Sequence, residues 1–197
     1  MYYAIFPKAD DDGMMLGVEY KRDHRGRSWH DGNIFTSDVN APVWKQHPKV
    51  PIKVTIEQGY EKAPMPSFLR GPIPIMSKKL LNTVREAGVD NIDSYRVELN
   101  YADGTLASED YYAFNLVGKL RAADLDKSVY DDNQPDKLIA MNFDSLLVDE
   151  NKTYGQLMFR LAENISTILI HERIKKAIEE AGIQYIRICA TKNVAIL

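Results

Sequence analysis

Residues 75–89 read IMSKKLLNTVREAGV and residues 169–183 read LIHERIKKAIEEAGI, so one pattern occurs twice, 94 residues apart and without gaps. Each copy is typical of a strand end, a short amphipathic helix, a glycine that stops the helix, and a second strand. We therefore expect two equivalent strand–helix–strand units, arranged around a shared sheet. Duplication and convergence both explain the pattern, because a helix stopped by glycine before a strand is common.

The ends of the two predicted helices carry recognisable signals. Ser77 is expected to cap the first helix, because its hydroxyl can accept from a free backbone N–H, and Gly88 is expected to end it. The second helix is predicted over residues 172–181, with Gly182 as its stop. His171 takes the place of the capping serine, so we interpret it as a helix-start residue and not as a catalytic base.

The remaining elements follow from alternation and from turn residues. The first 72 residues hold seven of the nine prolines, which makes long helices improbable there. We predict an α+β fold with a mixed, largely antiparallel sheet, a β-leaning, irregular N-terminal part over residues 1–72 and an α+β domain over residues 73–197. The predicted strands lie at residues 1–6, 14–20, 51–58, 92–99, 110–117, 157–161, 167–170 and 183–190.

Composition narrows the class of protein. The 197 residues carry a net charge of -3, so no basic bias indicates direct binding of nucleic acid. The apolar runs are too short for a membrane span, and the N-terminus lacks the pattern of a secretory signal, so we expect a cytoplasmic protein. Cys189, the single cysteine, lies in an apolar run and is expected to be a buried thiol.

Catalytic signatures are missing from the sequence. It contains no GxGxxG, no GxxxxGK[ST] and no GxSxG, and with one cysteine a Cys–His pair is improbable. We predict no enzyme, no cofactor and no metal. The alternative that chemistry leaves open is a small metal-dependent hydrolase that uses Asp23, His24, His30 and Asp31, since histidine and carboxylate suit zinc or iron.

The clearest electrostatic feature is residues 122–151, which hold eight acidic and two basic residues, a net charge of -6. Such a segment is either a solvated loop or a surface that steers a basic partner. We predict a partner-binding surface made of Asp124, Asp126, Tyr130, Asp131, Asp132, Asp149 and Glu150. Further candidate aromatic anchors are Trp44, Tyr111 and Tyr112, with core packing the favoured interpretation for Tyr112.

The C-terminal half, roughly residues 71–188, resembles the bacterial family called immunity protein eleven. The resemblance is carried by a strand with Tyr112 and Asn115, an Asp124…Ser128 pair, Phe159-Arg160, and the closing helix–Gly182–strand, although serine would be expected where His171 stands. It implies a protein of polymorphic toxin systems that binds a cognate toxin and blocks it.

A toxin that acts in the cytoplasm, such as a nuclease, would fit this expectation, because nucleases bind their substrates in basic clefts. The acidic stretch would complement such a cleft. A third interpretation of the chain is a ligand-sensing domain, which would require a deep apolar pocket between two lobes. The sequence leaves the oligomeric state open.

Overall fold

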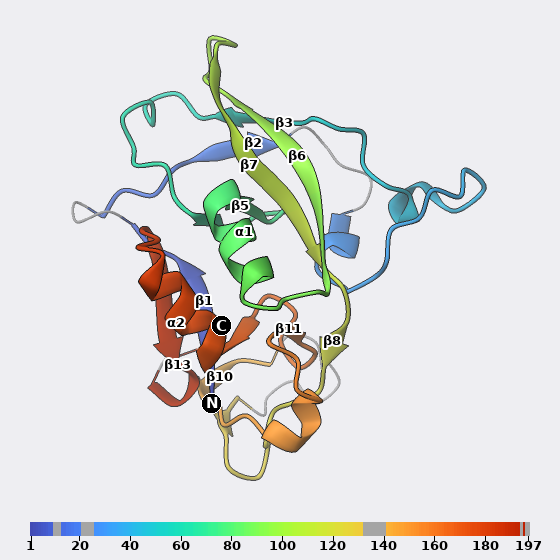
Figure 1. Cartoon of the computed structure of the whole chain (residues 1–197), viewed down its shortest axis with the longest axis vertical. Helices are drawn as coiled ribbons and strands as arrows, with labels where there is room; N and C mark the ends of the chain where they lie inside the picture. The colour runs from blue at the N-terminus through green and yellow to red at the C-terminus, as the bar shows by residue number, and fades with distance from the viewer. Residues whose placement is uncertain (10–12, 21–25, 132–140, 194, 196–197) are drawn as a thin grey trace.

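The computed structural model describes residues 1–9, 13–20, 26–131, 141–193 and 195. In this part of the chain, strands and two α-helices form the predicted α+β fold with mixed, largely antiparallel sheets (Figure 1). The helices are α1 (Lys78–Glu86) and α2 (Glu172–Glu180). Neither of these described helices is long and apolar enough to cross a lipid bilayer.

Five strands form one sheet, which we call the terminal sheet because it holds the first and the last strand. Their order is β13-β1-β12-β11-β8, and all neighbours are antiparallel except β11 and β8. The bounds are β1 Tyr2–Pro7, β8 Lys119–Leu120, β11 Met158–Leu161, β12 Ile168–His171 and β13 Ile186–Ala190. β1, from the N-terminal part, thus lies between two strands from the C-terminal end of the chain.

Six strands form a second sheet, which we call the hairpin sheet. Their order is β2-β3-β6-β7-β5-β4, with β3 and β6 parallel and the other neighbours antiparallel. The bounds are β2 Val18–Tyr20, β3 Ile52–Ile56, β4 Phe68–Leu69, β5 Ile75–Ser77, β6 Ile92–Asn100 and β7 Leu106–Leu116. A separate two-stranded ribbon pairs β9 (Val129–Tyr130) with β10 (Phe143–Ser145). The 3₁₀ turns are η1 Gly26–Trp29, η2 Val43–Lys45, η3 Glu150–Thr153 and η4 Thr191–Asn193.

The repeat in the sequence corresponds to two equivalent strand–helix–strand units, as predicted. The expectation of a shared sheet was wrong, because each unit pairs around its own middle strand, one in the hairpin sheet and the other in the terminal sheet. In one, β5, α1 and β6 follow one another and β7 lies between the strands; in the other, β12, α2 and β13 do so around β1. Residues that are 94 positions apart pair with equivalent residues of the two middle strands. Ala113 of β7 pairs with Ile75 and Tyr95, and Ala4 of β1 pairs with Leu169 and Cys189.

The middle strands also match in sequence, which the comparison at a fixed offset missed. Residues 2–4 and residues 111–113 both read Tyr-Tyr-Ala. The middle strand follows its unit in one case and opens the chain in the other, so no single offset aligns both parts. Matched pairing together with this second match favours duplication over convergence.

Both helix ends have the predicted geometry. Ser77 Oγ accepts from the Leu80 N–H at 3.2 Å, and His171 Nδ1 accepts from the Arg173 N–H at 3.2 Å. Gly88 and Gly182 follow the helices with φ of 105° and 60°, a region that glycine enters without a steric penalty.

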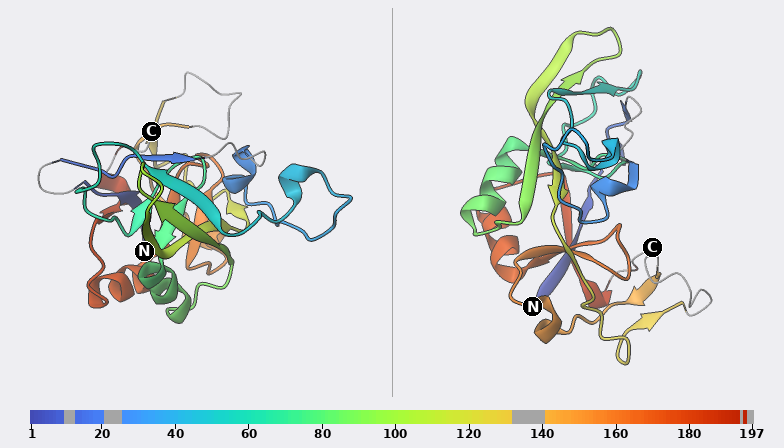
Figure 2. Two further views of the ribbon diagram at one scale, coloured as in Figure 1. Left: turned by 90° about the horizontal axis from the view of Figure 1, so that it is seen from above. Right: turned by 90° about the vertical axis from the view of Figure 1, so that its right-hand side faces the viewer.

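The apolar faces of the two helices meet in one core that also receives side chains from both sheets. Leu80, Leu81 and Val84 of α1 are buried there with Ile174 and Ile178 of α2. Each such side chain contributes about 1.5–3 kcal/mol of burial free energy. The helices lie side by side on one side of the molecule (Figure 2), and two further cores fill the opposite faces of the sheets.

Three local expectations were wrong. Only residues 18–20 of the strand predicted over residues 14–20 are paired. The strand predicted from residue 183 begins at Ile186, because Tyr185 adopts a φ of 54° that no strand accommodates. Cys189 is half-buried and not buried, because β13 is an edge strand.

Candidate partner-binding surface

The described part of the acidic segment covers the turns between β8 and η3, at one end of the terminal sheet (Figure 1). Asp132 lies outside the described residues. Residues 122–131 and 141–151 hold six acidic residues and one lysine, a net charge of -5. Asp124, Asp149 and Glu150 form ion pairs within the protein, and Asp126, Asp131, Asp144 and Glu150 are exposed.

Asp124 organises the turn that follows β8. Its carboxylate Oδ2 lies 2.7 Å from the Lys127 Nζ, and this hydrogen bond lowers the pKa of Asp124. Its backbone carbonyl accepts from the Ser128 N–H at 2.9 Å, and Ser128 Oγ accepts from the Leu147 N–H at 3.0 Å. The Asp124…Ser128 pair therefore joins this turn to the strand end before η3.

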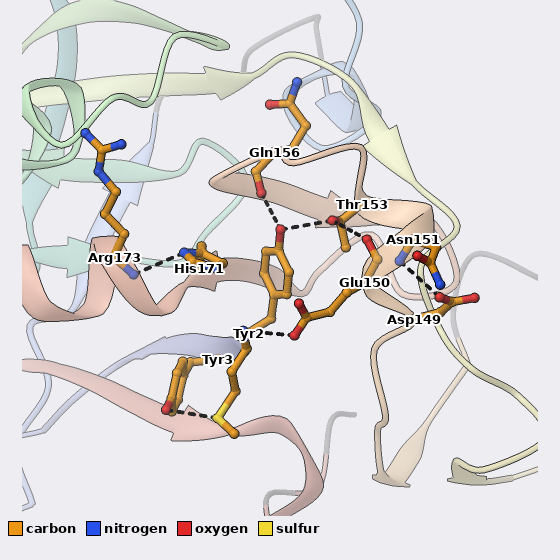
Figure 3. A network of polar contacts seen from close by, with 10 residues as sticks. Tyr2, Tyr3, Asp149, Glu150, Asn151, Thr153, Gln156, His171 and Arg173 are labelled. Carbon is orange, nitrogen blue, oxygen red and sulfur yellow. Dashed lines mark hydrogen bonds and ion pairs between the residues drawn. The ribbon is translucent and has the colours of Figure 1, made fainter.

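Asp149 caps η3, and Glu150 fastens the N-terminus to it (Figure 3). Asp149 Oδ1 accepts from the Asn151 N–H at 3.1 Å and so caps η3. Glu150 Oε1 lies 2.9 Å from the terminal ammonium of Met1, and the Tyr2 hydroxyl donates to Thr153 Oγ1 at 3.0 Å. These contacts give both carboxylates a role in the fold besides any in binding.

Asp126, Asp131, Asp144 and Glu150 are the exposed acidic residues in the described part of the segment. Tyr130 is half-buried, and its ring lies 5.9 Å from that of Phe143, centroid to centroid, against the core behind the terminal sheet. Of the predicted residues, Asp126, Asp131 and Glu150 are thus exposed, while part of the Tyr130 ring packs inward; the exposed Asp144 was not among the predicted residues.

A second surface, which the sequence analysis missed except for Trp44, is the loop of residues 34–50. We call it the arm, because it projects from the body of the molecule in two perpendicular views (Figures 1 and 2). It carries five exposed apolar side chains among few charges. They are Ile34, 69% exposed, Val39, 83%, Val43, 55%, Trp44, 42%, and Val50, 55%.

The arm is held in one conformation by its own hydrogen bonds. The Thr36 N–H donates to the Lys45 carbonyl at 2.8 Å, and the His47 N–H donates back to the Thr36 carbonyl at 3.0 Å. Inside the loop, Gln46 Nε2 donates to the carbonyl oxygens of Ala41, at 2.7 Å, and Val39, at 3.2 Å. The apolar tip is therefore preorganised, which lowers the entropy cost of binding.

Buried aromatic rings anchor the base of the arm. Phe35 is 2% exposed, and its ring lies 5.0 Å from that of Trp29, centroid to centroid, in a T-shaped contact. Trp29 in turn contacts Tyr95 on β6 at 5.7 Å. A signal was present in the sequence, since isolated valines and a tryptophan between Asp, Asn and Pro fit neither helical nor strand periodicity.

The other predicted aromatic anchors belong to the interior. Tyr111 is buried, and its hydroxyl donates to the Pro66 carbonyl at 2.9 Å, so its assignment to a binding surface was wrong. Tyr112 is partly buried against the core beneath the helices, in line with the favoured interpretation.

Of the four residues named for the hydrolase alternative, the structure describes only two. Asp23 and His24 lie outside the described residues. His30 Nε2 lies 3.2 Å from the Pro72 carbonyl, and Asp31 acts electrostatically on Arg160. Among the residues that the structure describes, no three His, Cys, Asp or Glu side chains are grouped as metal ligands.

Two further residues that carry the family resemblance, Arg160 and Asn115, connect the two sheets through the interior. Arg160 is 1% exposed and donates to the carbonyl oxygens of Ile165, at 2.9 Å, and Trp29, at 3.3 Å. Burial lowers the pKa of Arg160 to about 10. Asn115 is fully buried and donates to the Asn33 carbonyl. These side chains hold the segment around η1 against β7 and β11, and so they position the base of the arm.

Comparison with known proteins identifies one family. The model of an immunity protein family (Imm11) matches residues 2–190, which is nearly the whole chain and includes the N-terminal part that the resemblance left out. Among curated proteins, no match was found.

The environment of His30 predicts a dependence of stability on pH. Burial, and then the nearby Arg160, lower the pKa of His30 from 6.5 to about 4. Between these values the unfolded chain binds more protons, so the free energy of unfolding should fall as the pH falls from about 6.5 towards 4. His30→Gln should weaken this dependence, measured by urea unfolding at several pH values. His47→Gln, at an exposed histidine, is the control and should follow the wild type; an equal slope for all three proteins would contradict the prediction.

Proposed function

Because the chain belongs to the Imm11 family of immunity proteins, we propose that it binds and neutralises a cognate bacterial toxin that acts in the cytoplasm, without catalysing a reaction itself. The arm is the observation that carries this proposal. An immunity protein acts by forming a tight complex with its toxin. The arm presents a preorganised group of exposed apolar side chains, which is the kind of surface that such a complex buries.

The composition of the arm fits the centre of a protein interface. Exposed apolar side chains that gather on one projecting loop mark interaction sites on soluble proteins. Interface energies are dominated by a few anchors, with tryptophan prominent among them. Trp44 is exposed at 42%, with the Lys45 ammonium 5.0 Å from its ring centroid, and Val43 lies beside it. We infer that Val43 and Trp44 insert into the toxin.

The exposed carboxylates supply the charge that suits a basic toxin. Asp126, Asp131 and Asp144 are accessible, and Asp132 adds a fourth charge in the sequence. Negative charge on the binding protein raises the rate of association with a positive partner. A nuclease, with a cleft built for phosphate, is the toxin class we propose. Asp124, Asp149 and Glu150 contribute to this field while also serving the fold.

We expect Trp44→Ala to weaken binding to the cognate toxin by roughly 30-fold, because a hot-spot residue contributes about 2 kcal/mol or more. An inactive variant of the toxin, titrated calorimetrically, gives the affinity, and co-expression with the active toxin gives protection. Leu106→Ala, at an exposed apolar residue on the β6–β7 hairpin, is the matched control and should bind like the wild type. Equal affinities for both variants would contradict the proposal that the arm belongs to the interface.

Charge reversal of Asp131 and Asp132 to lysine should lower the association rate at low salt, with little change in the dissociation rate. The difference from the wild type should shrink as salt rises, since screening shortens the range of the field. Stopped-flow association at two ionic strengths measures this. Glu109→Lys, on β7, is the control. An unchanged association rate in the double variant would contradict the proposal that the acidic residues steer association. The arm would then be the one proposed binding surface left.

A further inference from the structure

A cavity of about 300 Å³ lies where the end of β1 meets the hairpin sheet. Its apolar wall includes Pro7 at the end of β1, Met15, Leu16 and Val18 before and within β2, and Pro66 and Leu69 at β4. Three polar side chains also line it: Lys8, Tyr20 and Arg70. A small, mostly apolar cavity with a few convergent polar groups is typical of a site for a small molecule.

The first polar group is a hydroxyl that the fold does not use. The Tyr20 side-chain oxygen is buried, and it makes no hydrogen bond with the described protein. Gly71 lies directly against it, since a Cβ at Gly71 would come within 2.9 Å of the hydroxyl oxygen. Buried hydroxyls in proteins are normally hydrogen-bonded, so this donor is suited to a ligand atom.

The second polar group is a cation without a counterion in the described chain. Arg70 lines the cavity while part of its side chain is exposed to solvent, and partial desolvation lowers its pKa. None of the described carboxylates lies within ion-pair distance of it, and its charged neighbour Arg160 repels it. With Lys8 also on the wall, the polar side of the cavity offers donors and positive charge.

These observations define the complementary ligand. A guanidinium and a hydroxyl match the two oxygens of a carboxylate, which accepts hydrogen bonds only. The apolar wall of prolines, methionine and leucine matches a hydrocarbon chain or ring. A phosphate would require more donors and would leave the apolar wall uncovered.

We propose that this cavity binds a small carboxylic acid with an apolar body, with its carboxylate on Arg70 and Tyr20 and its apolar body against the wall. The site is independent of the proposed toxin complex. Such a ligand would link the end of β1 to β2 and β4, because it would contact both sheets at once. Binding would therefore raise the stability of the folded protein, with the logarithm of ligand concentration once the ligand exceeds its dissociation constant.

The test uses the full chain and two probes, octanoate and 3-phenylpropanoate, with octan-1-ol as a neutral probe of the same chain length as octanoate. Calorimetry and thermal unfolding should show binding of at least one acid and weaker binding of the alcohol. Arg70→Met should reduce acid affinity roughly 10- to 100-fold, the range for a hydrogen bond to a charged group, without weakening the alcohol. Tyr20→Phe should reduce acid affinity by a smaller factor, and Arg96→Gln, at an exposed arginine on β6, should have no effect.

Circular dichroism of each variant separates loss of the site from loss of the fold, and Tyr20→Phe keeps the test valid if Arg70→Met does not fold. No binding of either acid would overturn the proposal, as would equal binding of acid and alcohol that Arg70→Met leaves unchanged.

Discussion

Burial of the middle strands β1 and β7 on both of their faces is the constraint on which the fold depends. Ala4 and Ala113 are fully buried and belong to the cores on the far sides of the two sheets. Their neighbours Ile5 and Phe114 point the other way, into the core that the two helices share. Each middle strand thus serves two cores at once. The N-terminal residues are for that reason as important to the terminal sheet as its C-terminal strands.

This arrangement separates the interior from the two surfaces that we propose as the toxin interface. Arg160 and Asn115 donate hydrogen bonds to backbone carbonyls in the interior, and these bonds hold the η1 segment and the base of the arm. The arm and the exposed carboxylates lie at the margins, where substitutions leave the cores intact.

The sequence predicted the local elements well and the long-range ones poorly. Ser77, His171, Gly88 and Gly182 marked the helix ends, because capping and left-handed turns depend on adjacent residues. Pairing of β1 with β12 and β13 depends on residues at opposite ends of the chain, which periodicity cannot detect. Of the candidate site, Trp44 was named but the arm was not, since its order depends on Thr36, Gln46 and the buried Phe35. The acidic residues were found by charge alone, whereas the partners of Asp124 and Glu150 became visible only in the folded protein.

The central claim is that residues 34–50 form the heart of the toxin interface. Hydrogen–deuterium exchange of the protein alone and in complex with its inactive cognate toxin tests this most directly. We expect the largest gain in protection in the arm, with a smaller gain in the acidic turns around Asp126 and Asp144. Protection confined to the surface of α1 and α2, with an arm that exchanges as fast in the complex as in the free protein, would contradict the account.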